Sequence, residues 1–160
     1  MTYLIVDDSD VMRVVIKELL VSLCRAKEGD MHEASGGVEA IRKYKLLRPD
    51  LVFLDVFMPR VDGKEVVVEL MKFDPNAKII MCTSAAEKEY VVDCMRAGAL
   101  DYITKPPIPK RFLAAVLRIL GNVFIENAVE NSIGNSIENA KEPEENGEAT
   151  EEPEETMRDK

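Results

Sequence analysis

The stretch that most limits the possible folds is the apolar run at residues 51–54, Leu-Val-Phe-Leu, which lies between Pro49-Asp50 and Asp55. Four apolar residues without a polar interruption predict a short strand that is buried on both faces, as in parallel sheets. Pro59 predicts that the chain then enters a loop. Open α/β sheets bind ligands at the carboxyl ends of their strands, so Asp55 stands at a candidate site. A lone aspartate after a strand more often caps the following turn, so the assignment depends on the residues at the other strand ends.

Strand and helix patterns alternate along the first 120 residues. Apolar runs predict strands at 3–6, 51–54 and 79–82, and weaker strand patterns lie at 30–34 and 101–104. Helical spacing of apolar residues predicts a helix after each strand. The first helix is expected to end at Gly29. The core positions expected of the first four helices include Ile16, Leu20, Val38, Ile41, Tyr44, Val66, Val67, Leu70, Tyr90, Val91, Cys94 and Met95. Because parallel neighbours require crossovers, the pattern predicts an α/β fold, a doubly wound five-stranded parallel sheet with helices on both faces.

Polar side chains stand where four of these strands end. They are Asp7, Asp8, Asp55, Thr83 and Lys105. Three crowded carboxylates repel one another, so they need a cation or a shared proton at neutral pH. Oxygen ligands without histidine or thiolate suit Mg²⁺. A lysine and a hydroxyl beside a metal are what a transferring phosphoryl group requires, and Asp55 would then be the nucleophile that forms an acyl phosphate.

The chain resembles the receiver domain of two-component response regulators over residues 2–120. The motifs that carry the resemblance are the acidic pair, the central aspartate, the threonine and Lys105-Pro106, in that order, with Thr83 and Lys105 separated by 22 residues. The resemblance implies a flavodoxin-like sheet of strand order 2-1-3-4-5. It also implies that Asp55 takes its phosphoryl group from a phosphohistidine on a sensor histidine kinase.

A metal site is also implied by the resemblance. Asp8, Asp55 and the backbone carbonyl of Phe57 would hold Mg²⁺, and Asp7 would act through a water molecule. The ordinary alternative for Asp8 is to cap the first helix, although Ser9 is available for that role.

The resemblance assigns the remaining site residues to the phosphoryl group and to signalling. Lys105 would pair with the phosphoryl group, Thr83 would hydrogen-bond to it, and the Lys105-Pro106 bond is expected to be cis. Tyr102 matches the aromatic switch position, whose ring turns inward when Thr83 moves toward the phosphoryl group. A solvated loop charge and a half-buried strand residue are the structural alternatives for Lys105 and Tyr102.

Two positions differ from the best-known chemotaxis members of the family. Phe57, two residues after the acceptor, and Ala85, two after Thr83, occupy places that in the family set how fast the acyl phosphate hydrolyses. Neither side chain can position a water molecule. We therefore predict slow self-dephosphorylation.

Three functions suit these residues to different degrees. The first is a phosphorylation-controlled switch, not an enzyme, that changes its affinity for a downstream protein. The second is a phosphorelay intermediate that passes the phosphoryl group to a histidine phosphotransfer protein. The third, an aspartyl-phosphate phosphatase, is disfavoured because it needs a second aspartate two residues after the nucleophile, where Phe57 stands.

Charge divides the chain into two parts. The net charge is −9, and residues 121–160 hold 12 acidic and 3 basic side chains, whereas residues 1–120 hold 18 of each. Neither part has the clustered basic face that direct nucleic-acid binding needs. No apolar run approaches the length needed for membrane insertion. The three cysteines lack metal-ligand spacing and suggest free thiols in a reducing cytoplasm.

The C-terminal part is expected to lack an output domain. We predict a receiver domain at 1–121, a possible helical extension or docking segment at 122–141, and an acidic disordered tail at 142–160. This division predicts a stand-alone receiver.

The last helix, from about Pro109, carries two apolar rows. The expected core row is Leu113, Val116, Leu117 and Leu120, and the second row is Phe112, Ala115, Ile119 and Val123. The second row could serve a partner or a phosphorylation-dependent homodimer, or it could widen the contact with the core. The resemblance implies signalling through the fourth helix, the fifth strand and the fifth helix.

Overall fold

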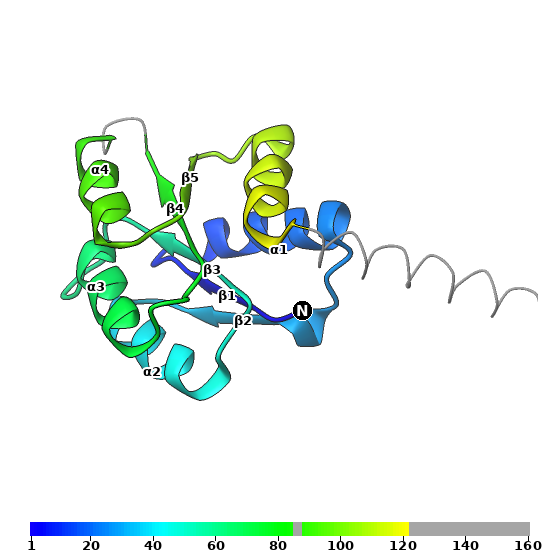
Figure 1. Ribbon diagram of the computed structural model, residues 1–160. Coiled ribbons are helices and arrows are strands. Elements are labelled where there is room, and N and C mark those ends of the chain that lie inside the picture. The colour runs from blue at the N-terminus through cyan, green and yellow to red at the C-terminus, as the bar shows by residue number, and fades with distance from the viewer. Residues whose placement is uncertain (85–87, 122–160) are drawn as a thin grey trace, which may run out of the picture.

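The computed structural model describes residues 1–84 and 88–121, and Figure 1 shows their arrangement. The elements are β1 (Tyr3–Val6), α1 (Asp10–Cys24), a 3₁₀ helix (Glu28–Asp30), β2 (Met31–Ala34), α2 (Gly37–Leu47), β3 (Leu51–Asp55), α3 (Gly63–Phe73), β4 (Ile79–Thr83), α4 (Lys88–Ala97), β5 (Asp101–Thr104) and a C-terminal helix described over residues 109–121. The predictions for Ala85, Val123 and the segments 122–141 and 142–160 lie outside the described residues. No described helix combines the length and the apolarity needed to cross a membrane.

The five strands form one parallel sheet in the order β2-β1-β3-β4-β5, which confirms the predicted topology. The helices α2, α3 and α4 lie on one side of it, and α1 and the C-terminal helix lie on the other (Figure 1). Strand β3 is central. Its residues Val52 and Leu54 pack into the core under α2, α3 and α4, whereas Leu51 and Phe53 pack into the other core. All four are fully buried, as the apolar run predicted.

The C-terminal helix buries residues from both of its apolar rows. Phe112 and Ala115, from the second row, are buried together with Val116 and Leu120. The Phe112 ring stacks on Phe53 of the central strand, with ring centroids 5.0 Å apart and an interplanar angle of 8°. The wider core contact is therefore correct for Phe112 and Ala115, and these two side chains are not available to a partner.

Helix α1 ends earlier than its sequence predicted. It stops at Cys24, with Arg25 in the left-handed conformation at φ 53°, and Gly29 lies beyond it in the 3₁₀ helix. The backbone N–H groups of Arg25 and Ala26 both donate to the carbonyl of Leu20, which closes the helix end. Burial of Ala26 directly after the turn favours this early ending, although glycine is the usual residue in a left-handed cap.

Three residues expected in the helix cores are instead exposed. They are Val38 at 65%, Tyr90 at 50% and Met95 at 37% exposure. Helix α2 buries small residues, Gly37 and Ala40, because it packs very close to the loop before α3. A Cβ atom at Gly37 would lie 2.7 Å from the carbonyl oxygen of Val61, so only glycine fits there.

The three cysteines, Cys24, Cys82 and Cys94, are free and buried, as predicted. Burial raises the pKa of Cys24 and of Cys94 to about 11. These thiols are therefore protonated at neutral pH and behave as small apolar core residues.

Candidate functional site

The carboxyl edge of the sheet brings together the polar residues that the strand ends predicted. Asp55 is the last residue of β3 and pairs in register with Cys82, so that Thr83, the last residue of β4, lies one position further along the neighbouring strand. Asp7 follows β1 directly, and Lys105 follows β5. The backbone N–H of Lys105 donates to the carbonyl of Thr83 at 2.7 Å, which fixes the segment after β5 to β4. The peptide bond from Lys105 to Pro106 is cis, as expected.

Lys105 joins two buried carboxylates. Its Nζ donates to Oδ1 of Asp55 at 2.7 Å and lies 2.7 Å from Oδ2 of Asp7. Asp7 is fully buried, and the Lys105 side chain is 19% exposed. Burial by itself lowers the pKa of Lys105, but the hydrogen bonds and charges of Asp55 and Asp7 outweigh it, so the pKa lies above its usual value. The lysine is therefore an ammonium at neutral pH, and it is not a solvated loop charge.

Asp7, Asp8 and Asp55 form a cluster that suits a hard divalent cation. One carboxylate oxygen from each lies within 4.8 Å of the others, with Asp8 exposed and the other two buried. Oδ2 of Asp7 faces Lys105 in an ion pair but accepts no aligned hydrogen bond within the described part of the chain. Three carboxylates against one ammonium leave two negative charges, and an oxygen-only ligand set matches Mg²⁺. The carbonyl of Phe57 as a further ligand stays a prediction.

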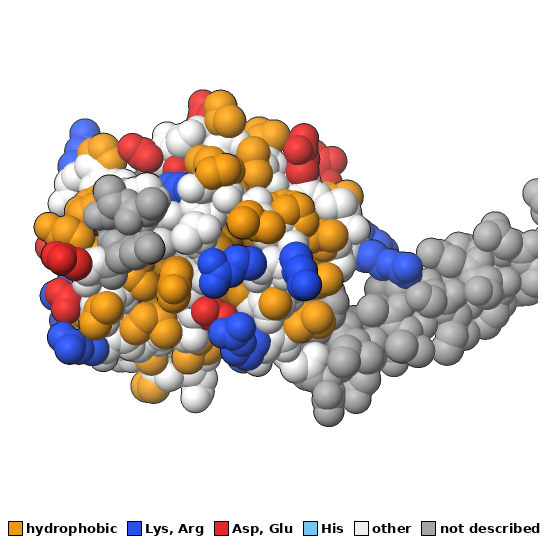
Figure 2. All heavy atoms as spheres, turned by 90° about the horizontal axis from the view of Figure 1, so that it is seen from above, with side chains coloured by type: hydrophobic (Ala, Val, Ile, Leu, Met, Phe, Trp, Pro, Cys, Tyr) orange, Lys and Arg blue, Asp and Glu red, His pale blue; other side chains and the backbone are white. Residues whose placement is uncertain are grey.

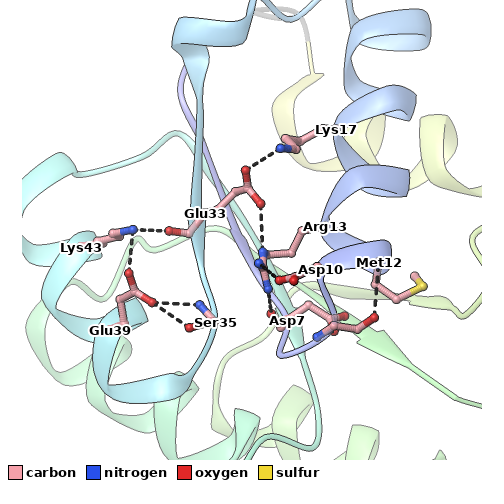
Figure 3. A network of polar contacts seen from close by, with 10 residues as sticks. Asp7, Asp10, Met12, Arg13, Lys17, Glu33, Ser35, Glu39 and Lys43 are labelled. Atoms are coloured by element: carbon pink, nitrogen blue, oxygen red, sulfur yellow. Dashed lines mark hydrogen bonds and ion pairs between the residues drawn. The ribbon is translucent and has the colours of Figure 1, made fainter.

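The turn between β1 and α1 is held by hydrogen bonds that Figure 3 shows. Oδ1 of Asp7 accepts from the backbone N–H of Ser9 at 2.9 Å, and the Ser9 hydroxyl caps α1. Arg13 donates to the backbone carbonyl of Asp7 at 2.7 Å and to the carboxylate of Glu33 on β2 at 2.9 Å. Because Ser9 fills the cap, Asp8 is not needed for that role and its carboxylate stays at the site.

A second network in Figure 3 fixes the other side of β2. Glu39 of α2 accepts from the backbone N–H of Ser35 at 2.9 Å and pairs with Lys43 at 2.8 Å. Lys43 also donates to the backbone carbonyl of Glu33. The hydrogen bond from Lys43 and then that from Ser35 lower the pKa of Glu39 to about 2. This network ties α2 to the edge strand.

The loop after the central strand folds back tightly on Asp55. The backbone N–H of Gly63 donates to the carbonyl of Val56 at 2.8 Å, and Asp62 caps α3 by accepting from Glu65 at 2.9 Å. A Cβ atom on Gly63 would lie 2.3 Å from the carbonyl oxygen of Asp55. The role of Gly63 was not predicted from the sequence. The Asp-Gly pair that begins seven residues after Asp55 was the available signal that the backbone passes close to Asp55.

Thr83 and Tyr102 lie on neighbouring strands in different surroundings. Thr83 is fully buried, and its hydroxyl donates to the carbonyl of Ser84 at 3.0 Å. Tyr102 pairs in register with Met81 and is 41% exposed, so its ring is not buried in the core. Their assigned roles, contact with a phosphoryl group and rotation of the ring, stay predictions.

An aromatic contact beside the site was missing from the sequence reasoning. Phe57, two residues after Asp55, meets Tyr90 in the first turns of α4, with ring centroids 4.6 Å apart and an interplanar angle of 71°. The apolar spacing of α4 had placed Tyr90 in the core. The available signal was that Phe57 and Tyr90 are aromatic residues that follow β3 and β4, which are neighbours in the sheet.

The fold and this arrangement of acids and lysine define a class of signalling domain. Residues 3–117 match the family model of the response regulator receiver domain, and the chain therefore belongs to that family, the receivers of two-component systems. It is similar to the chemotaxis protein CheY of Thermotoga maritima, with 40% identity over 116 residues that cover 72% of this chain and 94% of that protein. It is 45% identical over 103 residues to CheY of Halobacterium salinarum, covering 64% and 82% of the two chains.

Solved structures show the same fold. A putative response regulator from Chloroflexus aurantiacus matches with a TM-score of 0.66 and 28% identity, covering 74% of this chain and 96% of that one. The CheX-CheY-BeF₃-Mg²⁺ complex from Borrelia burgdorferi contains a chain that matches with a TM-score of 0.66 and 31% identity, covering 75% and 89%. A protein-glutamate methylesterase/protein-glutamine glutaminase from Bacillus licheniformis is 36% identical over 105 residues, which are only 29% of that enzyme. The similarity thus extends to a receiver-sized part of an enzyme.

Proposed function

We propose that the chain is a phosphorylation-controlled switch in which Asp55 accepts a phosphoryl group from a sensor histidine kinase in the presence of Mg²⁺. The observation that supports this most is the contact of Lys105 with Asp55 and Asp7 beside a cluster of three carboxylates. Such a site provides a carboxylate nucleophile, a fixed cation and oxygen ligands for a metal, which together are the requirements of phosphoryl transfer. We place the receiver unit at residues 1–121 and its action in the cytoplasm.

The residues divide the chemistry among them. A carboxylate oxygen of Asp55 attacks phosphorus, the bond from phosphorus to the histidine nitrogen breaks, and the phosphoryl group becomes an acyl phosphate. Asp8, Asp55 and the Phe57 carbonyl would hold Mg²⁺, with Asp7 acting through a water molecule, and the ion would supply positive charge for the phosphoryl oxygens. Lys105 exchanges its contact with Asp55 for one with a phosphoryl oxygen. The Thr83 hydroxyl turns from the Ser84 carbonyl to donate to another.

The output surface in this proposal is formed by α4, β5 and the C-terminal helix. Apolar side chains are exposed on it, and a cavity of about 530 Å³ is lined by Val91, Val92, Met95, Arg96 and Tyr102. Figure 2, a view of the molecule of Figure 1 from above, shows apolar, basic and acidic side chains intermixed on this face. Inward rotation of Tyr102 would change the shape of this cavity, which links phosphorylation to the affinity for a downstream protein.

The test is phosphorylation of the purified chain by a small acyl phosphate donor, with and without Mg²⁺, followed by intact mass. We expect a mass gain of one phosphoryl group that needs Mg²⁺ and is lost in Asp55→Asn. Asp93→Asn is the matched control. Asp93 is a half-buried aspartate of α4 that pairs with Lys64 and does not belong to the cluster of three carboxylates. Sizing of both forms tests for a phosphorylation-dependent homodimer. Label that persists in Asp55→Asn contradicts the proposal.

A further inference from the structure

The contact between Phe57 and Tyr90 connects the two segments that leave the site. Phe57 belongs to the loop after β3, whose last residue is Asp55, and Tyr90 belongs to α4, which follows Thr83 at the end of β4. Since β3 and β4 are neighbours in the sheet, the ring pair links the segment that follows the strand of Asp55 to the helix that follows the strand of Thr83.

The geometry of the pair is that of a specific contact. An edge-to-face arrangement with centroids 4.6 Å apart lies within the range that aromatic rings prefer. Phe57 is 41% exposed and Tyr90 is 50% exposed, so neither ring is fixed by deep burial in the core. The ring of Tyr90 is therefore one of the contacts that fix the position of the Phe57 ring.

We infer that Tyr90 is a positioning residue for the chemistry at Asp55: its ring holds the Phe57 side chain beside the acyl phosphate and limits the approach of water. This inference rests on the proposed phosphorylation of Asp55. In the reaction that is slowed, water attacks phosphorus, the bond between phosphorus and the Asp55 oxygen breaks, and inorganic phosphate leaves with the protons of water. The carboxylate of Asp55 is regenerated.

A second connection lets the ring contact be separated from a general effect of α4. Lys64 of α3 pairs with Asp93 of α4 at 3.0 Å, three residues after Tyr90. This ion pair also holds α4 near the segment after β3, but it involves neither ring. Loss of the ion pair tests whether any loosening of α4 has the same result as loss of the ring.

The experiment measures the rate at which purified, phosphorylated full-length protein loses its phosphoryl group in Mg²⁺. We expect Tyr90→Leu to raise this rate by about two- to twelvefold. The interaction energy of an aromatic pair corresponds to a change of that size in the ratio of Phe57 rings that are held in place to rings that are released. Tyr90→Phe keeps the ring and should keep the slow rate. Asp93→Asn should also keep it.

A double-mutant cycle identifies the route of the effect. If Tyr90 acts through Phe57, then Tyr90→Leu changes nothing further in a Phe57→Ala protein. The inference is overturned if Tyr90→Leu leaves the rate of dephosphorylation unchanged. It is also overturned if Tyr90→Leu changes the rate in a Phe57→Ala protein as much as in the unmodified protein, or if Asp93→Asn changes the rate as much as Tyr90→Leu does. If the unmodified chain is not phosphorylated at Asp55, both the proposed function and this inference fail. If Asp55 is phosphorylated normally but Tyr90→Leu leaves the rate unchanged, only the role of Tyr90 is refuted.

Discussion

Replacement of Lys105 by methionine tests the electrostatic balance of the site. Methionine keeps most of the length of the side chain but removes the ammonium that lies 2.7 Å from both Asp7 and Asp55. Two carboxylates that are almost fully buried are then left without their cation. Breaking a buried ion pair costs about 3–5 kcal/mol, and we expect about 3 kcal/mol here because Asp8 is exposed and gives the cluster some access to water.

Mg²⁺ should restore much of this loss. The ion would neutralise the same carboxylates that Lys105 contacts, and a ligand at one hundred times its dissociation constant stabilises a folded protein by about 2.7 kcal/mol. Without competition from the ammonium, the variant should bind Mg²⁺ more tightly than the original chain. Mg²⁺ should therefore stabilise Lys105→Met more than it stabilises the unmodified protein.

The assay is urea unfolding followed by circular dichroism, in a chelator and in Mg²⁺. Lys110→Met is the matched control, since Lys110 is exposed near the start of the C-terminal helix, and we expect a change below about 0.5 kcal/mol. Equal stability of Lys105→Met and the unmodified chain in chelator would refute the reasoning. The same holds if Mg²⁺ stabilises both proteins to the same extent.

Three further predictions concern the surroundings of the site. Gly63→Ala should cost about 2–3 kcal/mol and weaken Mg²⁺ binding, because the new methyl group would collide with the backbone of Asp55, whereas Gly29→Ala meets no atom within 4 Å and should be near neutral in the same unfolding assay. Phe112→Ala should cost about 3–5 kcal/mol, and a cost below about 0.5 kcal/mol would show that this ring does not belong to the core. The pKa of Glu39 is lowered from 4.5 to about 2 on folding, so the stability that its charge contributes is present above pH 4.5 and is lost as the pH falls toward 2. Glu39→Gln should therefore be less stable at pH 6, by less than about 1 kcal/mol, and should match the unmodified chain near pH 2; a gap that widens in acid would contradict this.

The sheet and the members of the site were predictable because they depend on local signals. The apolar run at 51–54 marked the strand that is buried on both faces, and each polar residue of the site stands at the end of a strand. Parallel pairing then brings strand ends together whatever the details of the helices. Asp7, Asp55 and Lys105 were therefore expected to converge, and they do.

The face that each helix buries was less predictable, because it is set by packing against neighbouring elements. Periodicity placed Val38 in the core, but the close approach of α2 to Val61 turns Gly37 and Ala40 inward instead. Similarly, α1 ends at Arg25, which adopts the left-handed conformation, because hydrogen bonds to the carbonyl of Leu20 close the helix there. The position of Gly29, from which the helix end was predicted, does not reveal this. The ion pairs of Lys105 depend on distances between the ends of β1, β3 and β5, which the spacing of residues in the sequence does not give.

The placement of Asp55, the proposed acceptor, on the central strand has a consequence for how such a chain diversifies. Asp55 ends a strand with neighbours on both sides and packed layers above and below, whereas the exposed apolar residues of α4 and β5 lie at the rim of the molecule. Under the proposed function, substitutions at the rim would exchange one downstream partner for another without disturbing Asp55. A substitution in β3 would instead affect both phosphorylation and the packing that connects Asp55 to the rim.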